Sequence, residues 1–171
     1  MVRDPAPVVG GLELPDVSRR GEPVSLRAQS DGLLLVYFGY TQCPDVCPTT
    51  MADVREALAG LEGQRSKVDF GMITVDPGRD TERVLTDYVQ AFFPAGHALR
   101  TASPKLLART AKAFGAGFQV GRAKDGTVEV AHTAFVYAID AVGRIRVQWG
   151  FGTPAHAIRH DVQALLGEGS R

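Results

Sequence analysis

The sequence predicts an α/β fold built on a partly parallel sheet, and three observations support this prediction. The chain of 171 residues has the length of one ordinary domain, and its 44% hydrophobic and 22% charged residues are enough to bury a core. Short apolar runs rich in β-favouring residues alternate with stretches whose apolar residues recur every three or four positions. Gly and Pro separate these stretches. We therefore expect one domain at residues 9–171, preceded by a flexible lead-in at residues 1–8.

The first third of the chain predicts a hairpin, a buried strand and a helix. Residues 11–30 combine Gly and Pro with alternating apolar positions, which predicts a small N-terminal β-hairpin. Residues 33–38, LLLVYF, are a continuous apolar run, typical of a strand buried on both faces. Residues 48–63 have apolar residues at helical spacing. Pro48 suits the first helical position, because its missing N–H would be unpaired there anyway, and this places Cys47 at or near the N-cap.

The rest of the chain continues the alternation of strands and helices. The expected strands are residues 67–76, two short strands around an Asp125-Gly126 turn, residues 133–140 and residues 144–150. The expected helices are residues 79–93, capped by Asp80 or Thr81, residues 103–115 and residues 153–167. Crossover units come first, followed by an antiparallel hairpin and a helix, and the cysteines lie at the first strand–helix turn. This order matches a thioredoxin-like fold with an N-terminal β-hairpin extension.

The charge balance excludes two classes of partner. Lys+Arg and Asp+Glu both number 19, so the formal net charge is zero, whereas a nucleic-acid or anionic-membrane binder should carry a basic excess. The longest apolar runs are residues 33–38 and 134–139, and a membrane span needs about 20 residues. We therefore expect neither a membrane span nor a signal peptide within this chain.

Both cysteines lie in one short segment, YFGYTQCPDVCP, at residues 37–48. Sites in open α/β sheets lie at the carboxyl ends of strands, where Cys43 and Cys47 follow the first long strand. The N-terminus of the next helix adds partial positive charge, so we expect at least one thiolate to be favoured. The pair is spaced one residue wider than the C-x-x-C of thioredoxin-type exchange. Two sulfurs on one side of this loop can close a disulfide or hold one metal ion, and such soft ligands select copper(I).

Other interpretations of the cysteine pair stay open. Two core cysteines without a role are one, because free Cys is often a small core residue. A structural disulfide is another, although it would close a very short loop with little entropic gain. A structural zinc site would need two further His or carboxylate ligands.

A third metal ligand should be a histidine, and the chain has four. His97 lies in a Pro/Gly loop, and His156 and His160 stand four apart on the last expected helix. That i, i+4 spacing can bind metal, but a solvated helix face explains it better. His132 stands immediately before the strand at 133–140, a junction that lies beside the cysteine loop in a thioredoxin-like layout. A histidine satisfied at a strand end is the alternative.

Two acidic residues follow the strand at 67–76. Asp76 is expected at the same sheet edge as the cysteines, where it could orient the site or meet a partner; an Asx-type turn with Pro77 explains it equally well. Asp80 is expected to act as a helix N-cap.

Three segments together resemble the Sco/SenC family of copper-binding proteins, which help to build the binuclear copper site of cytochrome c oxidase. They are YFGYTQCPDVCPTT (37–50), ITVDPGRDT (73–81) and HTAFVYAID (132–140). The first two are specific, the third falls at the expected place, and the similarity extends over about residues 9–167.

The resemblance implies a set of ligands and partners. Cys43, Cys47 and His132 would bind copper as Cu(I) or Cu(II), with the oxidase copper-site subunit as partner and another copper chaperone as donor. The protein would be a monomer outside the cytoplasm, on the periplasmic side of a cell membrane or in the mitochondrial intermembrane space. Family members are usually tethered by an N-terminal transmembrane helix, so this chain would be the soluble domain of such a protein.

Two functions follow from these residues. The first is a copper metallochaperone, which is not an enzyme and needs Cys43, Cys47 and His132. The second is a thiol–disulfide oxidoreductase that reduces cysteines of the oxidase subunit or of another exported protein, and it needs only the two thiols.

Overall fold

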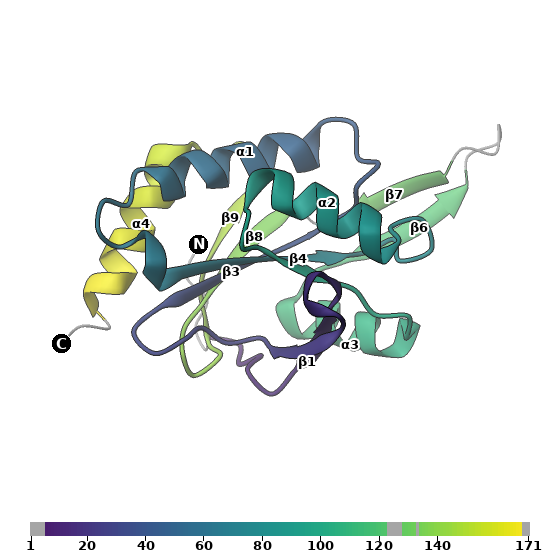
Figure 1. Cartoon of the computed structure of the whole chain (residues 1–171), viewed down its shortest axis with the longest axis horizontal. Helices are drawn as coiled ribbons and strands as arrows, with labels where there is room; N and C mark the ends of the chain where they lie inside the picture. Colours follow the sequence, from purple (N-terminus) through teal and green to yellow (C-terminus); the bar gives the residue numbers. More distant parts are fainter. Residues whose placement is uncertain (1–5, 123–127, 133, 169–171) are drawn as a thin grey trace.

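The computed structural model of the chain describes residues 6–122, 128–132 and 134–168 (Figure 1). Seven strands form one sheet in the spatial order β2-β1-β5-β4-β3-β8-β9. Their bounds are Glu13–Asp16 (β1), Glu22–Ser25 (β2), Leu33–Gly39 (β3), Val68–Thr74 (β4), His97–Leu99 (β5), Phe135–Ile139 (β8) and Ile145–Gly150 (β9). Phe118–Arg122 (β6) and Val128–His132 (β7) pair as a separate two-stranded sheet, and the Asp125-Gly126 turn expected between them lies outside the described residues.

The predicted α/β fold is confirmed, and its centre is β3. All seven residues of this strand are buried, because both faces of the sheet are covered. β3 and β4 run parallel, as do β4 and β5, whereas β8 lies antiparallel on the other side of β3. The N-terminal pair β1–β2 is antiparallel and extends the sheet beyond β5. This is a thioredoxin-like arrangement with an added N-terminal hairpin.

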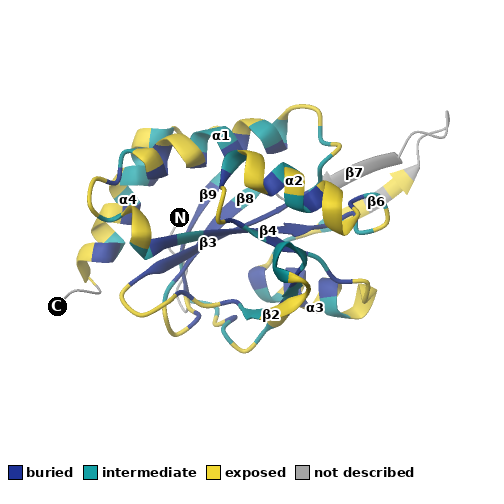
Figure 2. Cartoon of the chain, viewed as in Figure 1, coloured by how far each residue is buried: buried dark blue, intermediate teal, exposed yellow. Residues whose placement is uncertain are grey.

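Helices cover both faces of the sheet. Val46–Ala59 (α1), Glu82–Phe92 (α2) and Ala155–Glu168 (α4) pack on one face, and Pro104–Phe114 (α3) packs on the other with the hairpin (Figure 1). Figure 2 shows the central strands as buried and the outward helix faces as exposed. Among the described residues, no helix is both long enough and apolar enough to cross a membrane.

Two helix starts differ from the predictions. Of the two predicted caps of α2, Thr81 is confirmed, because its side chain accepts a hydrogen bond from the Val84 N–H, whereas the interpretation of Asp80 as the cap is wrong. Helix α1 begins at Val46, two residues earlier than predicted, which places Cys47 inside the first turn instead of at the N-cap. Pro48 is therefore the third residue of α1 instead of the first. It is tolerated there because the first few N–H groups of a helix have no helical carbonyl as partner.

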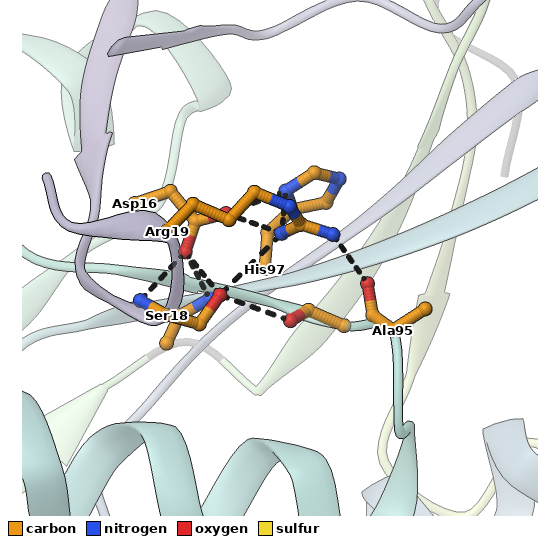
Figure 3. A network of polar contacts seen from close by, with 7 residues as sticks. Asp16, Ser18, Arg19, Ala95 and His97 are labelled. Atoms are coloured by element: carbon orange, nitrogen blue, oxygen red, sulfur yellow. Dashed lines mark hydrogen bonds and ion pairs between the residues drawn. The ribbon is translucent and has the colours of Figure 1, made fainter. Parts of the chain in front are cut away.

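A buried carboxylate joins the N-terminal hairpin to β5 (Figure 3). Asp16 accepts hydrogen bonds from the backbone N–H groups of Ser18 (3.0 Å) and Ala98 (3.1 Å), pairs with Arg19, and lies 2.8 Å from His97 Nδ1. Burial alone would raise the pKa of Asp16, but hydrogen bonds from His97, Ser18 and Arg19 outweigh it and hold that pKa well below its usual range. His97 therefore belongs to a strand, not to the predicted loop, and its contacts are structural.

Part of the expected lead-in, residues 1–8, is packed against the domain. The Pro7 carbonyl accepts a hydrogen bond from the Ile145 N–H at 2.9 Å, and Val8 forms a β-bridge with Arg144. The first five residues lie outside the described part of the chain.

Candidate functional site

The cysteine loop connects the carboxyl end of β3 to the first turn of α1. It lies beside the end of β4, because the Val75 N–H donates to the Gly39 carbonyl at 2.9 Å. Cys43 is half-buried, and Cys47 is fully buried in the core cluster between the sheet and helices α1, α2 and α4. The predicted position of the pair at the carboxyl edge of the sheet is therefore confirmed.

The two cysteines contact each other through a backbone hydrogen bond. Both are free thiols, and the Cys47 N–H donates to Cys43 Sγ at 3.3 Å. The Cys43 sulfur thus satisfies an N–H of the first helical turn that no helical carbonyl can reach. This contact explains why α1 starts before Pro48, since the sulfur takes the place of a side-chain cap that Asp45 does not provide.

Burial, not the helix terminus, determines the protonation of Cys47. Burial raises the pKa of its thiol to about 12, although a hydrogen bond from Tyr37 works in the opposite direction. The helix N-terminus therefore does not favour a thiolate at Cys47. The expectation that at least one of the two sulfurs is a favoured thiolate stays a prediction. At neutral pH Cys47 is a thiol, and it must lose its proton when it binds a metal ion.

A buried aspartate fixes the start of the loop to the end of β4. Asp80 accepts hydrogen bonds from the Thr41 N–H (3.1 Å), from Thr41 Oγ1 (2.6 Å) and from Thr74 Oγ1 (2.6 Å). It is fully buried, and Arg100 Nε donates to its backbone carbonyl at 2.8 Å. Sequence reasoning missed this role, because nothing in the spacing shows that Thr41 and Thr74 meet at one carboxylate.

Asp76 reaches the cysteine loop through an arginine. It forms an ion pair with Arg79, whose Nη1 donates to Gln42 Oε1 at 3.0 Å. The Arg79 guanidinium also lies over the Tyr40 ring, with Cζ 5.9 Å from the ring centroid. Asp76 is itself nearly buried, so its charge is directed to Arg79 more than to solvent.

The structure locates the backbone of His132 but not its side chain. His132 is the last residue of β7, and its side chain lies outside the described part of the structure. His97 is held by the Asp16 cluster, and His156 and His160 are exposed on α4. Within the described residues, no group of three or more His, Cys, Asp or Glu is arranged to hold a metal ion.

Together, the fold and the loop define a thioredoxin-like protein with a dithiol at the start of its first crossover helix. The sequence model of the SCO1/SenC family matches residues 5–167, and the chain belongs to this family. The resemblance seen in the sequence is thus confirmed.

Two relatives illustrate the similarity of this sequence to known members of the family. The chain is 31% identical over 79% of its length to a putative copper-binding protein of Stutzerimonas stutzeri, and 33% identical over 82% to a SCO2-like protein of Rickettsia felis. It spans 65% and 68% of these two relatives, about two thirds of their length.

The solved structures share the fold. Copper-bound ScoI of Bradyrhizobium japonicum is 29% identical, with a TM-score of 0.77 over 92% of this chain and 99% of that one. Copper-bound ScoI of Arabidopsis thaliana is 23% identical, with a TM-score of 0.82 over 94% of this chain and 99% of that one. BsSco, a Sco protein described with a disulfide switch, is 20% identical, with a TM-score of 0.70 over 95% of each chain. At these last two identities the likeness shows the fold alone.

Proposed function

We propose that this protein is a copper metallochaperone that binds one copper ion through Cys43, Cys47 and His132. It would assist assembly of the binuclear copper site of cytochrome c oxidase. The observation that carries the proposal is the placement of two free thiols in one loop, at the carboxyl edge of a thioredoxin-like sheet. The family match and the copper-bound relative from Bradyrhizobium japonicum support it.

The donor set suits copper. Two thiolates are soft ligands and favour copper(I), and an added imidazole also suits copper(II). Copper would displace the proton of the buried Cys47 thiol, so copper uptake would release protons and strengthen as pH rises. The disulfide form of the pair lacks both thiolates and would not hold the ion.

His132 and Asp76 would complete the copper site, one as a ligand and the other as a positioning residue. His132, at the end of β7, would supply the third ligand. Asp76 would orient the cysteine loop through Arg79, which contacts both Gln42 and the Tyr40 ring. The partner would be the oxidase copper-site subunit, with another copper chaperone as donor, in the periplasm or the mitochondrial intermembrane space.

One observation favours a second candidate function, thiol–disulfide oxidoreductase. Cys43 is half-buried and precedes a fully buried Cys47 in the same loop, so one sulfur is open to attack while the other is shielded. In this reading the pair would reduce cysteines of the oxidase subunit or of another exported protein. Only the copper function needs His132.

Anaerobic copper titration of the reduced protein, followed by native mass spectrometry, tests the proposal. We expect one copper per chain when the thiols are free and none after oxidation to the disulfide. The titration is repeated with zinc present as a competing metal ion, and we expect the two-thiolate site to bind copper in preference to zinc. Stoichiometric zinc binding without copper uptake would reject the copper function.

Removal of the third ligand separates the two functions. In His132→Ala, copper(II) affinity should fall by about tenfold to a hundredfold, comparable with the loss of supporting groups at metal sites, whereas copper(I) should persist on two thiolates. His156→Ala and His160→Ala are matched controls on an exposed helix face and should bind like the parent. Copper(II) affinity is measured by competition with a chelator.

Two outcomes would count against the assignment of His132. One is parental copper(II) affinity in His132→Ala together with a loss in either control. The other is no change in any of the three variants, which would leave the cysteine pair with a different third ligand and favour the oxidoreductase.

A further inference from the structure

The buried Cys47 sulfur has a tyrosine hydroxyl as its hydrogen-bond donor. Tyr37, fully buried in β3, donates a hydrogen bond from its hydroxyl to Cys47 Sγ at 3.4 Å. Tyr40, the first residue after β3, packs with Cys43 against the same hydrophobic cluster. The strand that leads into the cysteine loop therefore provides a phenol donor to the buried sulfur of the pair.

A third tyrosine nearby lacks such a contact. Tyr88 of α2 packs against the same hydrophobic cluster as Cys43 and Cys47. Its hydroxyl oxygen is buried and has no hydrogen-bond partner among the described residues. It therefore shares the apolar surroundings of the pair without donating to either sulfur.

We propose that Tyr37 is a positioning residue that favours the dithiol form of the cysteine pair over its disulfide. The inference rests on the proposed function, since either reading of it requires the reduced pair. A thiol or thiolate sulfur carries more negative charge than a disulfide sulfur and is the better acceptor. The Tyr37 hydrogen bond is made in the free-thiol form, so it stabilises that form preferentially.

The equilibrium concerned is a two-electron exchange. A small dithiol reductant attacks the Cys43–Cys47 disulfide, the S–S bond breaks, and the pair takes up two electrons and two protons. The reductant leaves as its own disulfide. Tyr37 takes no part in the transfer; it changes the relative free energies of the two end states. A role in packing alone would alter the unfolding temperature without altering this equilibrium.

The test compares Tyr37→Phe with Tyr88→Phe in copper-free protein. Each variant is equilibrated in dithiothreitol redox buffers, alkylated, and analysed by mass spectrometry for the fraction of free thiol. Loss of the Tyr37 donor should shift the equilibrium constant toward the disulfide by about threefold to tenfold, or about 15–30 mV. Tyr88→Phe is the matched control and should leave the potential unchanged, because its hydroxyl donates to neither sulfur.

An unchanged potential in Tyr37→Phe would overturn the inference, as would an equal shift in Tyr88→Phe. If the Tyr37→Phe variant does not fold, 3-fluorotyrosine at position 37 decides, because its more acidic phenol is the stronger donor and should shift the equilibrium toward the dithiol; an unchanged potential there overturns the inference. The copper titration of the parent protein is independent of these measurements. Shifted potentials without copper binding reject the copper function alone, whereas copper binding with unchanged potentials rejects this inference alone.

Discussion

Removal of either cysteine should lower the copper(I) affinity by about 10²–10⁴-fold, the range by which two linked sites exceed a single one. The reason is geometric: Cys43 and Cys47 lie in one loop, joined by a 3.3 Å contact from the Cys47 N–H to Cys43 Sγ, so one thiolate holds the ion within reach of the other. The variants are Cys43→Ser and Cys47→Ala, because serine suits a half-exposed site and alanine avoids a buried hydroxyl. Competition with a copper(I) chelator under anaerobic conditions measures the loss.

His156→Ala provides the control for this experiment, since it removes an exposed side chain without touching the loop. Thermal unfolding of each apo variant shows whether the fold is kept, which we expect because the core does not depend on the metal. Parental affinity in either cysteine variant would contradict a two-thiolate site.

The fold could be predicted because its main elements have local signals. Residues 33–38 form an unbroken apolar run, and β3 is buried on both faces as such a run requires. Helix α3 begins and ends within a residue of its prediction, since Ser103 caps it and Gly115 ends it in the left-handed region. β5 was missed because its three residues are too short to show any alternation.

The candidate site could be predicted only in part. Both cysteines were identifiable from their shared loop, and their edge of the sheet followed from the order of strands and helices. The raised pKa of Cys47 could not be predicted, because sequence shows the nearby helix start but not the burial that outweighs it. In the sequence, Tyr37 is one more residue of an apolar strand. Only the structure shows that its hydroxyl donates a hydrogen bond to Cys47 Sγ.

The hydrogen bonds that Asp80 accepts from Thr41 and Thr74 could not be predicted from the sequence either. Asp80 lies six residues after Thr74 but 39 residues after Thr41, and only the parallel pairing of β3 with β4 brings these side chains together. Helix caps are common and are recognised locally, so a cap was the simpler interpretation of Asp80. The structure instead assigns this aspartate to the loop that holds the cysteines.

Asp80→Ala should destabilise the protein by about 2–4 kcal/mol, because it leaves the buried Thr74 hydroxyl and the half-buried donors of Thr41 without their acceptor. Urea unfolding followed by circular dichroism measures the change in the free energy of unfolding. Asp87→Ala is the matched control from the same segment: the Asp87 side chain is 71% exposed and its only ion pair is with Arg83 at 3.6 Å among the described residues, so its loss should cost less than about 0.5 kcal/mol.

The same substitution should also loosen the cysteine loop, because Asp80 accepts from the Thr41 backbone two residues before Cys43. We therefore expect faster alkylation of the buried Cys47 in native Asp80→Ala than in Asp87→Ala, at a urea concentration well below either unfolding transition. Equal stability of the two variants would show that the carboxylate does not anchor the loop. A lower stability with unchanged Cys47 alkylation would place the role of Asp80 in the packing of α2 against β4 instead of in the cysteine loop.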